Sequence, residues 1–166
     1  MKIDTERLYL RRAELEDSYF INALLNSPSW IQFIGDRGIS SREKAIGYIQ
    51  NSLWTSYDKN GFGLLVVCLK ANHTPLGLCG FLQRDYLEHP DIGFAFLPSF
   101  EGKGFAFEAA SAVMKYGASD LNLKRVYAIC METNEKSIRL LNRLGFQKTE
   151  VIKPNAYGEE LLLFSN

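Results

Sequence analysis

The feature that most constrains this fold is a glycine-containing loop between an apolar strand and an alanine-rich helix. The apolar run from Ile92 to Leu97 is typical of a strand, and Pro98 ends it. Gly102 and Gly104 follow in the loop, and the helix begins directly after them. Glycine permits backbone conformations that other residues avoid, and the first N–H groups of a helix have no partner inside it. This order of elements predicts an anion site, most often one for a phosphate.

Strand and helix signals alternate along the chain in the order β-α-α-β-β-β-α-β-α-β-β. The run 64–69 is apolar on both faces, so this strand should lie inside a sheet that helices cover on both sides. We expect one α+β domain over residues 1–166, because this length suits a single core. The expected strands span residues 8–12, 62–70, 76–83, 91–97, 125–131, 146–152 and 159–164, and the expected helices 14–26, 40–60, 105–119 and 134–144.

Several helix ends can be predicted from local signals. Ser27-Pro28-Ser29 should end the first helix, which turns Leu15, Phe20, Ala23 and Leu24 inward. Ser40 has capping-box spacing to Glu43 and should begin the second helix. Gly145 should cap the last helix at its carboxyl end. Residues 8–12 alternate between apolar and polar, which suits a strand towards an edge of the sheet.

Composition excludes several classes of function. Lysine plus arginine equals aspartate plus glutamate, at 19 each, so the chain lacks the basic surplus of a general nucleic-acid binder. No apolar run approaches a membrane span, and the N-terminus lacks a signal-peptide core, so we expect a cytoplasmic protein without a membrane partner. Cys68, Cys79 and Cys130 each lie in an apolar run, and their odd number favours buried thiols over disulfides or a zinc site. No metal site is expected.

Two nucleotide-binding motifs do not fit the glycine loop. A Walker loop requires lysine and a hydroxyl residue after its last glycine, and Phe105 stands there instead. A dinucleotide fingerprint requires a third glycine, which is Phe107 here, in a loop near the first strand of a repeating fold. A tight turn without a ligand stays open as an alternative, as does a nucleotide-binding module of another kind.

The segment Gly102-Lys103-Gly104-Phe105-Ala106 resembles the pyrophosphate loop of the GNAT superfamily of N-acetyltransferases. Asp91-Ile92-Gly93-Phe94 before it, and Asn134-Glu135-Lys136-Ser137 with Leu144-Gly145-Phe146 after it, extend the resemblance over the whole chain. The start Thr5-Glu6-Arg7-Leu8 and the Asn134-x-x-Ser137 spacing are most similar to the Rim-type branch. The resemblance implies a mixed, mostly antiparallel central sheet, and an acetyl-CoA-dependent enzyme that acetylates a protein N-terminus.

The resemblance also implies where the cofactor binds. The residues assigned to coenzyme A are Phe96, Leu97, Glu101, Gly102, Lys103, Gly104, Phe105, Ala106, Asn134 and Ser137. Asn134 is equally a good helix N-cap, and Ser137 a polar first-turn residue, so the structural and functional interpretations stand side by side. Two positions depart from the broad family pattern: Ser99 replaces the usual Gln or Arg, and Leu141 replaces a tyrosine general acid. Ser137 is therefore the candidate acid.

The remaining catalytic and acceptor assignments are less constrained. Attack by an amine requires loss of a proton, and Glu88, His89 and Asp91 lie near the start of the strand that leads to the loop. Asn134, Glu88 and Asp91 thus join Ser137 as catalytic candidates, in a direct transfer without a covalent enzyme intermediate. Trp30, Phe33, Trp54 and Tyr57 are expected either in the core or around an acceptor pocket.

Three kinds of function remain open for the chain. The acceptor is a peptide N-terminus or a small-molecule amine such as a polyamine or an aminoglycoside. A non-catalytic acyl-CoA-binding domain is the alternative outside enzymes, because the tyrosine is missing at Leu141. A monomer and a homodimer are both compatible with the sequence.

Overall fold

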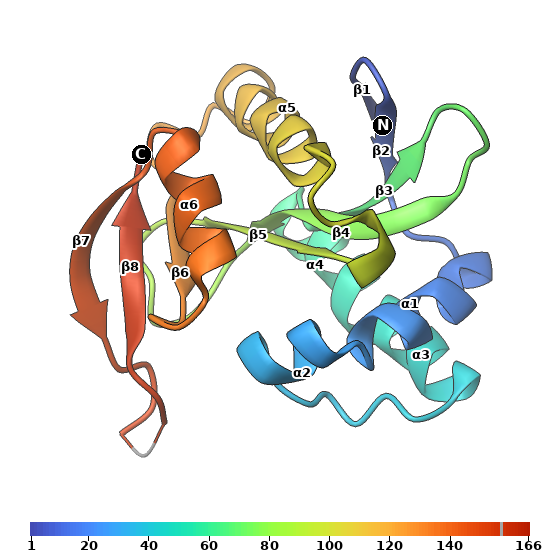
Figure 1. Ribbon diagram of the computed structural model, residues 1–166, viewed down its shortest axis with the longest axis horizontal. Coiled ribbons are helices and arrows are strands. Elements are labelled where there is room, and N and C mark those ends of the chain that lie inside the picture. Colours follow the sequence, from blue (N-terminus) through green and yellow to red (C-terminus); the bar gives the residue numbers. More distant parts are fainter. Residues whose placement is uncertain (157) are drawn as a thin grey trace.

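An eight-stranded sheet runs through the protein, for which the computed structural model describes residues 1–156 and 158–166 (Figure 1). Its strand order is β1-β2-β3-β4-β5-β6-β8-β7. Among the described residues, β5 and β6 form the one parallel pair, and all other neighbours are antiparallel. The strands are β1 (Lys2–Asp4), β2 (Leu8–Arg11), β3 (Leu64–Leu69), β4 (Pro75–Leu82), β5 (Asp91–Phe96), β6 (Tyr127–Cys130), β7 (Gln147–Ile152) and β8 (Leu161–Ser165).

Helices cover both faces of this sheet, with α5 on one side and α1 to α4 on the other (Figure 1). Together with the mixed sheet they confirm the expected α+β class. The helices are α1 (Ser18–Leu25), α2 (Pro28–Phe33), α3 (Arg42–Tyr48), α4 (Thr55–Asn60), α5 (Phe105–Ser119) and α6 (Glu135–Arg143), with short 3-10 turns η1 (Leu15–Asp17) and η3 (Pro98–Phe100) and a π-helical segment η2 (Ile49–Trp54).

The central strands are buried on both faces, as their apolar sequence predicts. Residues 64–68 of β3 and 76–81 of β4 are all buried. On the α5 side, a Cβ atom at Gly117 would lie 2.5 Å from the Phe81 ring, so glycine is needed for α5 to pack this closely on β4. The three cysteines are free buried thiols, as expected.

Two elements were not predicted from the sequence. Strand β1 pairs with β2, so β2 lies one strand in from the edge. Helix α2 is the second of these elements. Pro28 lies in its first turn, where the missing N–H breaks no hydrogen bond of the helix. The expected first helix is divided into η1 and α1, and Ala23 on it is exposed rather than inward.

The N-cap of α3 is one residue later than predicted. The Ser41 hydroxyl, and not that of Ser40, accepts a hydrogen bond from the Lys44 N–H, at 3.2 Å. The two serines are adjacent, so a spacing rule alone cannot separate them. Gly145, with φ of 90°, follows the last residues of α6 as predicted.

The parallel pair β5–β6 is very short. Its register contains only Asp91 opposite Tyr127, with a hydrogen bond of 2.9 Å from the Tyr127 N–H to the Pro90 carbonyl. Beyond this point the two strands diverge, and Figure 1 shows β5 running across the view while β6 runs down it. The carboxyl ends of the two strands, and the helices that follow them, therefore flank an opening in the sheet.

Candidate functional site

The loop between η3 and α5 has two residues in the left-handed backbone region. Gly102 has φ of 75° and Gly104 φ of 81°, and Gly104 is also the N-cap of α5. A side chain at either position would strain this conformation. The predicted need for two glycines therefore follows from the backbone itself.

The loop N–H groups form an anion-binding concavity. The Glu101 N–H donates to the Pro98 carbonyl at 3.2 Å. In the described part of the chain, the N–H groups of residues 102–106 donate to no protein acceptor. Consecutive free N–H groups at a helix N-terminus, with left-handed glycines among them, suit a phosphate or pyrophosphate group. The loop thus fits the group that the sequence predicts for it.

The first turn of α6 is connected to this loop. The Lys136 Nζ atom lies 2.9 Å from a Glu101 carboxylate oxygen, in a partly exposed ion pair. The Asn134 side chain caps α6 by accepting from the Ser137 N–H at 3.3 Å, so its structural role is confirmed. The Ser137 hydroxyl is half-buried and has no hydrogen-bond partner among the described residues. The structure therefore brings together the loop, Asn134 and Ser137.

The edge of β5 presents backbone groups to the opening. The Leu97 N–H donates to the Leu76 carbonyl on the β4 side at 2.9 Å, and the Leu97 carbonyl accepts from Phe100 at 2.9 Å. Because backbone groups alternate between the two sides of a strand, those of Phe94 and Phe96 point towards β6. The β5–β6 register contains only Asp91 opposite Tyr127, so no sheet ladder continues to the Phe94 and Phe96 N–H groups. Leu97 has no free backbone group and can contribute only its side chain.

Asp91 lies where β5 and β6 separate and is ion-paired. Its carboxylate is 1% exposed, and the Arg84 Nε atom lies 2.9 Å from one oxygen and 3.1 Å from the other. Burial raises the pKa of Asp91, although Arg84 opposes the shift. Phe81 faces α5 and Ile92 is opposite it, so Asp91 points to the face that α1 to α4 cover.

The other acid–base candidates are placed differently. The Glu88 carboxylate is exposed on the loop before β5 and has no partner among the described residues. The His89 ring contacts the Tyr127 ring, with 5.2 Å between centroids. Leu141 is buried on the inner side of α6, where it packs in the core. The tyrosine general acid that the family pattern places at this position is thus replaced by a core residue.

The cysteines are not placed as nucleophiles. Burial raises the pKa of the Cys130 thiol to about 11, and it also raises the pKa values of Cys68 and Cys79. A protonated thiol is a poor nucleophile. No group of three or more His, Cys, Asp or Glu side chains in the described residues is arranged to hold a metal ion. None of the helices described for this chain has the length and apolar character needed to cross a bilayer.

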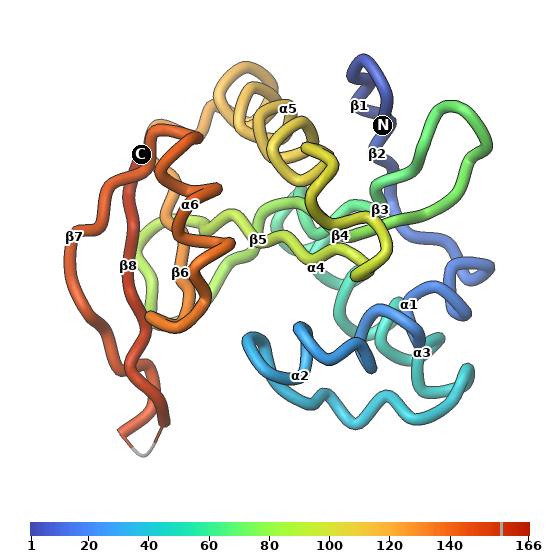
Figure 2. Tube along the Cα trace, viewed as in Figure 1, coloured from blue at the N-terminus to red at the C-terminus, as the bar shows by residue number. Residues whose placement is uncertain are grey.

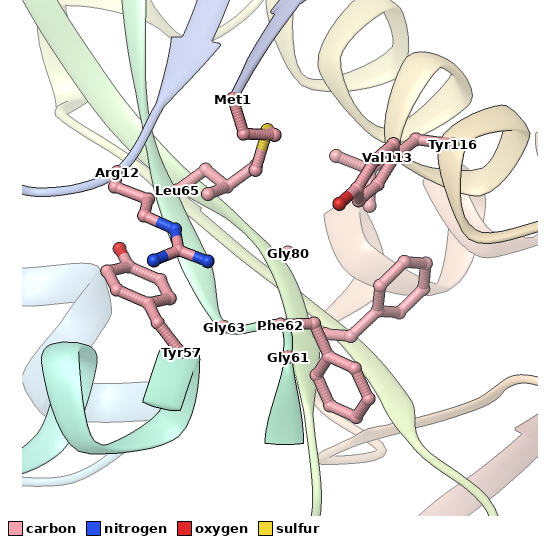
Figure 3. A pocket seen from close by; sticks show the side chains of 11 residues that line it. Met1, Arg12, Tyr57, Gly61, Phe62, Gly63, Leu65, Gly80, Val113 and Tyr116 are labelled. Atoms are coloured by element: carbon pink, nitrogen blue, oxygen red, sulfur yellow. The ribbon is translucent and has the colours of Figure 1, made fainter. Parts of the chain in front are cut away.

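The aromatic residues 54 and 57 hold the N-terminal segment in place. The Trp54 indole donates to the Ala13 carbonyl at 2.8 Å, and the Tyr57 hydroxyl accepts from the Ala13 N–H at 3.1 Å. A small, mostly apolar pocket lies beside Tyr57, between β3, β4 and α5 (Figure 3). No residue of the glycine loop or of α6 lines this pocket, so it is separate from the candidate site. Trp30 is buried in the core, and Phe33 is half-buried.

Several residues that shape the site were not singled out from the sequence. Arg7 contacts the glycine loop from the β1–β2 turn, and Glu108, which also accepts from the Thr5 hydroxyl, holds Arg7. The start Thr5-Glu6-Arg7 was part of the family resemblance, but no sequence signal indicated that Arg7 meets Glu108. Arg84, the partner of Asp91, had no sequence signal of its own.

Comparisons with known proteins agree with this geometry. The family described as "Acetyltransferase (GNAT) domain" matches residues 7–147. The uncharacterized N-acetyltransferase p20 of Bacillus licheniformis is 34% identical over 152 residues, which cover 90% of this chain and 84% of that protein. Spermidine N(1)-acetyltransferase of Escherichia coli K12 is 45% identical over 49 residues, 30% of this chain and 26% of that protein.

A solved structure shows the same fold over the full length. The ribosomal L7/L12 α-N-protein acetyltransferase RimL, in complex with coenzyme A, has a TM-score of 0.83 at 16% identity, covering 100% of this chain and 97% of that one. The free loop N–H groups described above suit the same co-substrate. The chain belongs to the GNAT family of acetyltransferases, and is an acyltransferase that uses acetyl-CoA.

Proposed function

We propose that this enzyme is a Rim-type acetyltransferase whose acceptor is the amino terminus of a protein or peptide. The observation that carries the proposal is the convergence of three features at one opening: the free loop N–H groups, the unpaired edge of β5 and the first turn of α6. We further propose that residues 1–166 act as a single cytoplasmic domain, as a monomer or a homodimer.

In this proposal the glycine loop holds the pyrophosphate of coenzyme A. The N–H groups of residues 102–106 donate to its oxygens, and the Lys103 ammonium adds charge at the rim. The backbone of Phe96 and the side chain of Leu97 hold the pantetheine arm of coenzyme A, which leads to the thioester. The side-chain NH2 group of Asn134 contacts the same arm from α6, because the helix cap uses only the side-chain carbonyl oxygen.

The reaction forms an amide C–N bond and breaks the thioester C–S bond. The Phe94 or Phe96 N–H stabilises the negative charge that develops on the carbonyl oxygen, since the β5–β6 ladder ends before both residues. The Ser137 hydroxyl donates a proton to the departing sulfur and regains one from water. The β5–β6 opening contributes by holding the amine and the thioester in contact.

Asp91 is the strongest of the three candidates for the group that receives the proton of the amine, since the His89 ring is packed against Tyr127. Asp91 lies where β5 and β6 separate, whereas Glu88 is exposed on the preceding loop. Burial raises the pKa of Asp91, which makes its carboxylate a better proton acceptor. Arg84 fixes the orientation of the carboxylate.

Three observations bear on the acceptor. RimL acts on a protein amino terminus according to its name and shares the fold over the full length. The spermidine acetyltransferase is more similar in sequence but only over 49 residues. A polyamine carries several positive charges, and the buried carboxylate of Asp91 is already neutralised by Arg84. This favours an acceptor with a single amino group, and spermidine is the second candidate.

The test is an acceptor screen that measures release of the coenzyme A thiol from acetyl-CoA. The panel contains peptides with different N-terminal residues, the same peptides with a blocked N-terminus, spermidine and an aminoglycoside. We expect turnover with free peptide N-termini and none with the blocked peptides. A kcat/KM for spermidine that exceeds that of every peptide would contradict the proposal and support the polyamine alternative.

A further inference from the structure

The Arg7 side chain reaches from the β1–β2 turn onto the glycine loop. Its Nη1 atom donates to the Lys103 carbonyl at 3.0 Å, and its guanidinium carbon lies 4.4 Å from the centroid of the Phe105 ring. A Cβ atom at Gly104 would lie 3.3 Å from the Arg7 Nη2 atom. Figure 2 shows the blue β1–β2 hairpin beside α5, although the two elements are far apart in the sequence. Arg7 thus contacts Lys103 and Phe105, the residues on either side of Gly104.

Glu108 holds the Arg7 guanidinium in this place. The carboxylate accepts from the Arg7 Nε atom at 2.7 Å, from the Arg7 backbone N–H at 2.7 Å and from the Thr5 hydroxyl at 2.6 Å. Burial by itself would raise the pKa of Glu108, but the hydrogen bonds from Thr5 and Arg7 outweigh it and lower the pKa. Glu108 stays ionised at neutral pH and lies in the first turn of α5. The guanidinium is therefore oriented by the helix that follows the loop.

The contact with the Lys103 carbonyl has a direct consequence for the loop N–H groups. In a trans peptide, the C=O of one residue and the N–H of the next point in opposite directions. The structure contains no cis peptide in its described residues, so a Lys103 carbonyl that points to Arg7 turns the Gly104 N–H away from it. That N–H belongs to the group of free donors at the N-terminus of α5. Arg7 thereby controls the orientation of a donor that it does not touch.

We propose that Arg7 is a positioning residue for the donor substrate: it fixes the glycine loop in the conformation that binds the pyrophosphate of coenzyme A. The inference depends on the proposed assignment of the loop to the pyrophosphate. A purely structural role is the alternative. Arg7 is 44% exposed, and ion pairs at such positions contribute little to stability.

The test compares two ligands that differ in the pyrophosphate: coenzyme A, and pantetheine, which lacks the whole nucleotide part. Arg7→Met keeps the length of the side chain and removes its donors. Arg7→Lys keeps the charge but cannot bond Glu108 and the Lys103 carbonyl together in a fork. The matched control is Lys70→Met, because the Lys70 ammonium bonds the Thr5 carbonyl in the same turn and does not contact the loop.

We expect Arg7→Met to weaken coenzyme A binding by about tenfold, the scale of one charge-assisted hydrogen bond. Pantetheine binding should stay unchanged, Arg7→Lys should fall between wild type and Arg7→Met, and Lys70→Met should bind both ligands as wild type does. Dissociation constants come from calorimetry or NMR titration, with melting temperatures of the free proteins as a check of folding.

Three results would overturn the inference, and they are distinguishable. If wild type binds coenzyme A and pantetheine equally, the loop does not bind the pyrophosphate, and the proposed assignment fails together with the inference. If wild type prefers coenzyme A but Arg7→Met keeps that full preference, the loop assignment stands and the positioning role of Arg7 is wrong. Equal weakening of both ligands by Arg7→Met would likewise assign Arg7 a general structural role.

Discussion

Ser137 has a half-buried hydroxyl without a protein partner in the described residues, in the first turn of a helix that is tied to the glycine loop. If it protonates the departing sulfur, Ser137→Ala should lower kcat by about a hundredfold, the lower end for general acid catalysis. The KM for acetyl-CoA should stay within about twofold, because the interaction matters in the transition state. Steady-state kinetics with the best acceptor from the screen measure both constants.

Asn142→Ala is the matched control, since Asn142 is exposed and lies on the same helix. It should leave both constants unchanged. An unchanged kcat in Ser137→Ala would show that the serine is a first-turn residue without a chemical role. A rise in KM alone would assign its hydroxyl to cofactor binding.

Gly104 can be tested against a second glycine with the same backbone conformation. Gly104 and Gly38 have φ of 81° and 67°, and a Cβ at Gly38 would meet nothing within 4 Å. Valine at either position should cost about 1–3 kcal/mol of stability from backbone strain. Only Gly104→Val should also abolish coenzyme A binding, because its side chain would press on Arg7 and the strained loop would lose the conformation that binds the pyrophosphate.

The measurements are thermal unfolding of both variants and titration with coenzyme A. Gly38→Val serves as the control for lost stability. Retained binding of coenzyme A by a folded Gly104→Val protein would contradict the role of the loop.

Sequence alone predicts those site residues whose geometry is local. The two glycines and the cap at Asn134 follow from rules that span three or four residues, and the structure confirms both. The Arg7–Glu108 contact joins residues 101 positions apart, and no local rule predicts which turn reaches the helix. The same limit applies to Arg84, whose role follows only from its ion pair with the buried Asp91.

At the scale of elements, Tyr57 joins α4 to β3 and to the segment before η1. Its hydroxyl donates to the Leu64 carbonyl at 2.5 Å and accepts from the Ala13 N–H at 3.1 Å. Burial raises the pKa of Tyr57 from 10.0 to about 12. The folded protein therefore holds this proton more tightly than the unfolded chain.

The resulting stability is fully present below pH 10 and is lost as pH rises from 10 towards 12. This loss amounts to about 2–3 kcal/mol in the free energy of unfolding, from two pKa units at 1.36 kcal/mol each. In Tyr57→Phe, unfolding at pH 8 should cost about 1 kcal/mol less, and the alkaline loss should be smaller. Urea unfolding between pH 8 and 11.5 gives both curves, and parallel curves would contradict the assignment.

Elements with a strong sequence period were predicted, and those whose existence depends on neighbours were not. The central strands and α5 carry long apolar patterns, and the structure confirms them. Strand β1 has three residues and exists because it pairs with β2. Helix α2 has only six residues and begins with Pro28. Because a proline suits a loop as well as the first turn of a helix, the sequence favours a loop and a helix equally here.

At the scale of the whole molecule, the opening between β5 and β6 is what connects the fold to the reaction. A sheet neighbour would satisfy the N–H groups of Phe94 and Phe96, but β6 diverges after Tyr127. The sheet continues through β8 and β7 on the other side, so the opening is an interior gap and not an edge. Sequence patterns show the two strands, but the divergence depends on the packing of α5 and α6 against them.

This arrangement predicts a residue-specific response to coenzyme A in amide hydrogen exchange. The N–H groups of Phe94 and Phe96 should exchange rapidly in the free protein, because the β5–β6 ladder ends before them. A ligand that lies along β5 should slow them by up to about a hundredfold at a ligand concentration of 100 times its dissociation constant. The Leu97 N–H is the internal control: it is bonded to Leu76 and should be protected without ligand.

The glycine-loop amides extend the same experiment to the other end of the ligand. Residues 102–106 should gain protection from coenzyme A but not from pantetheine, which lacks the pyrophosphate. Phe94 and Phe96 should respond to both, since pantetheine keeps the thiol arm that lies along β5. Slow exchange at Phe94 and Phe96 in the free protein would mean that the opening is closed in solution. Protection of the loop without protection of β5 would place the thioester outside the opening, and the proposed use of the β5 backbone in catalysis would then be wrong.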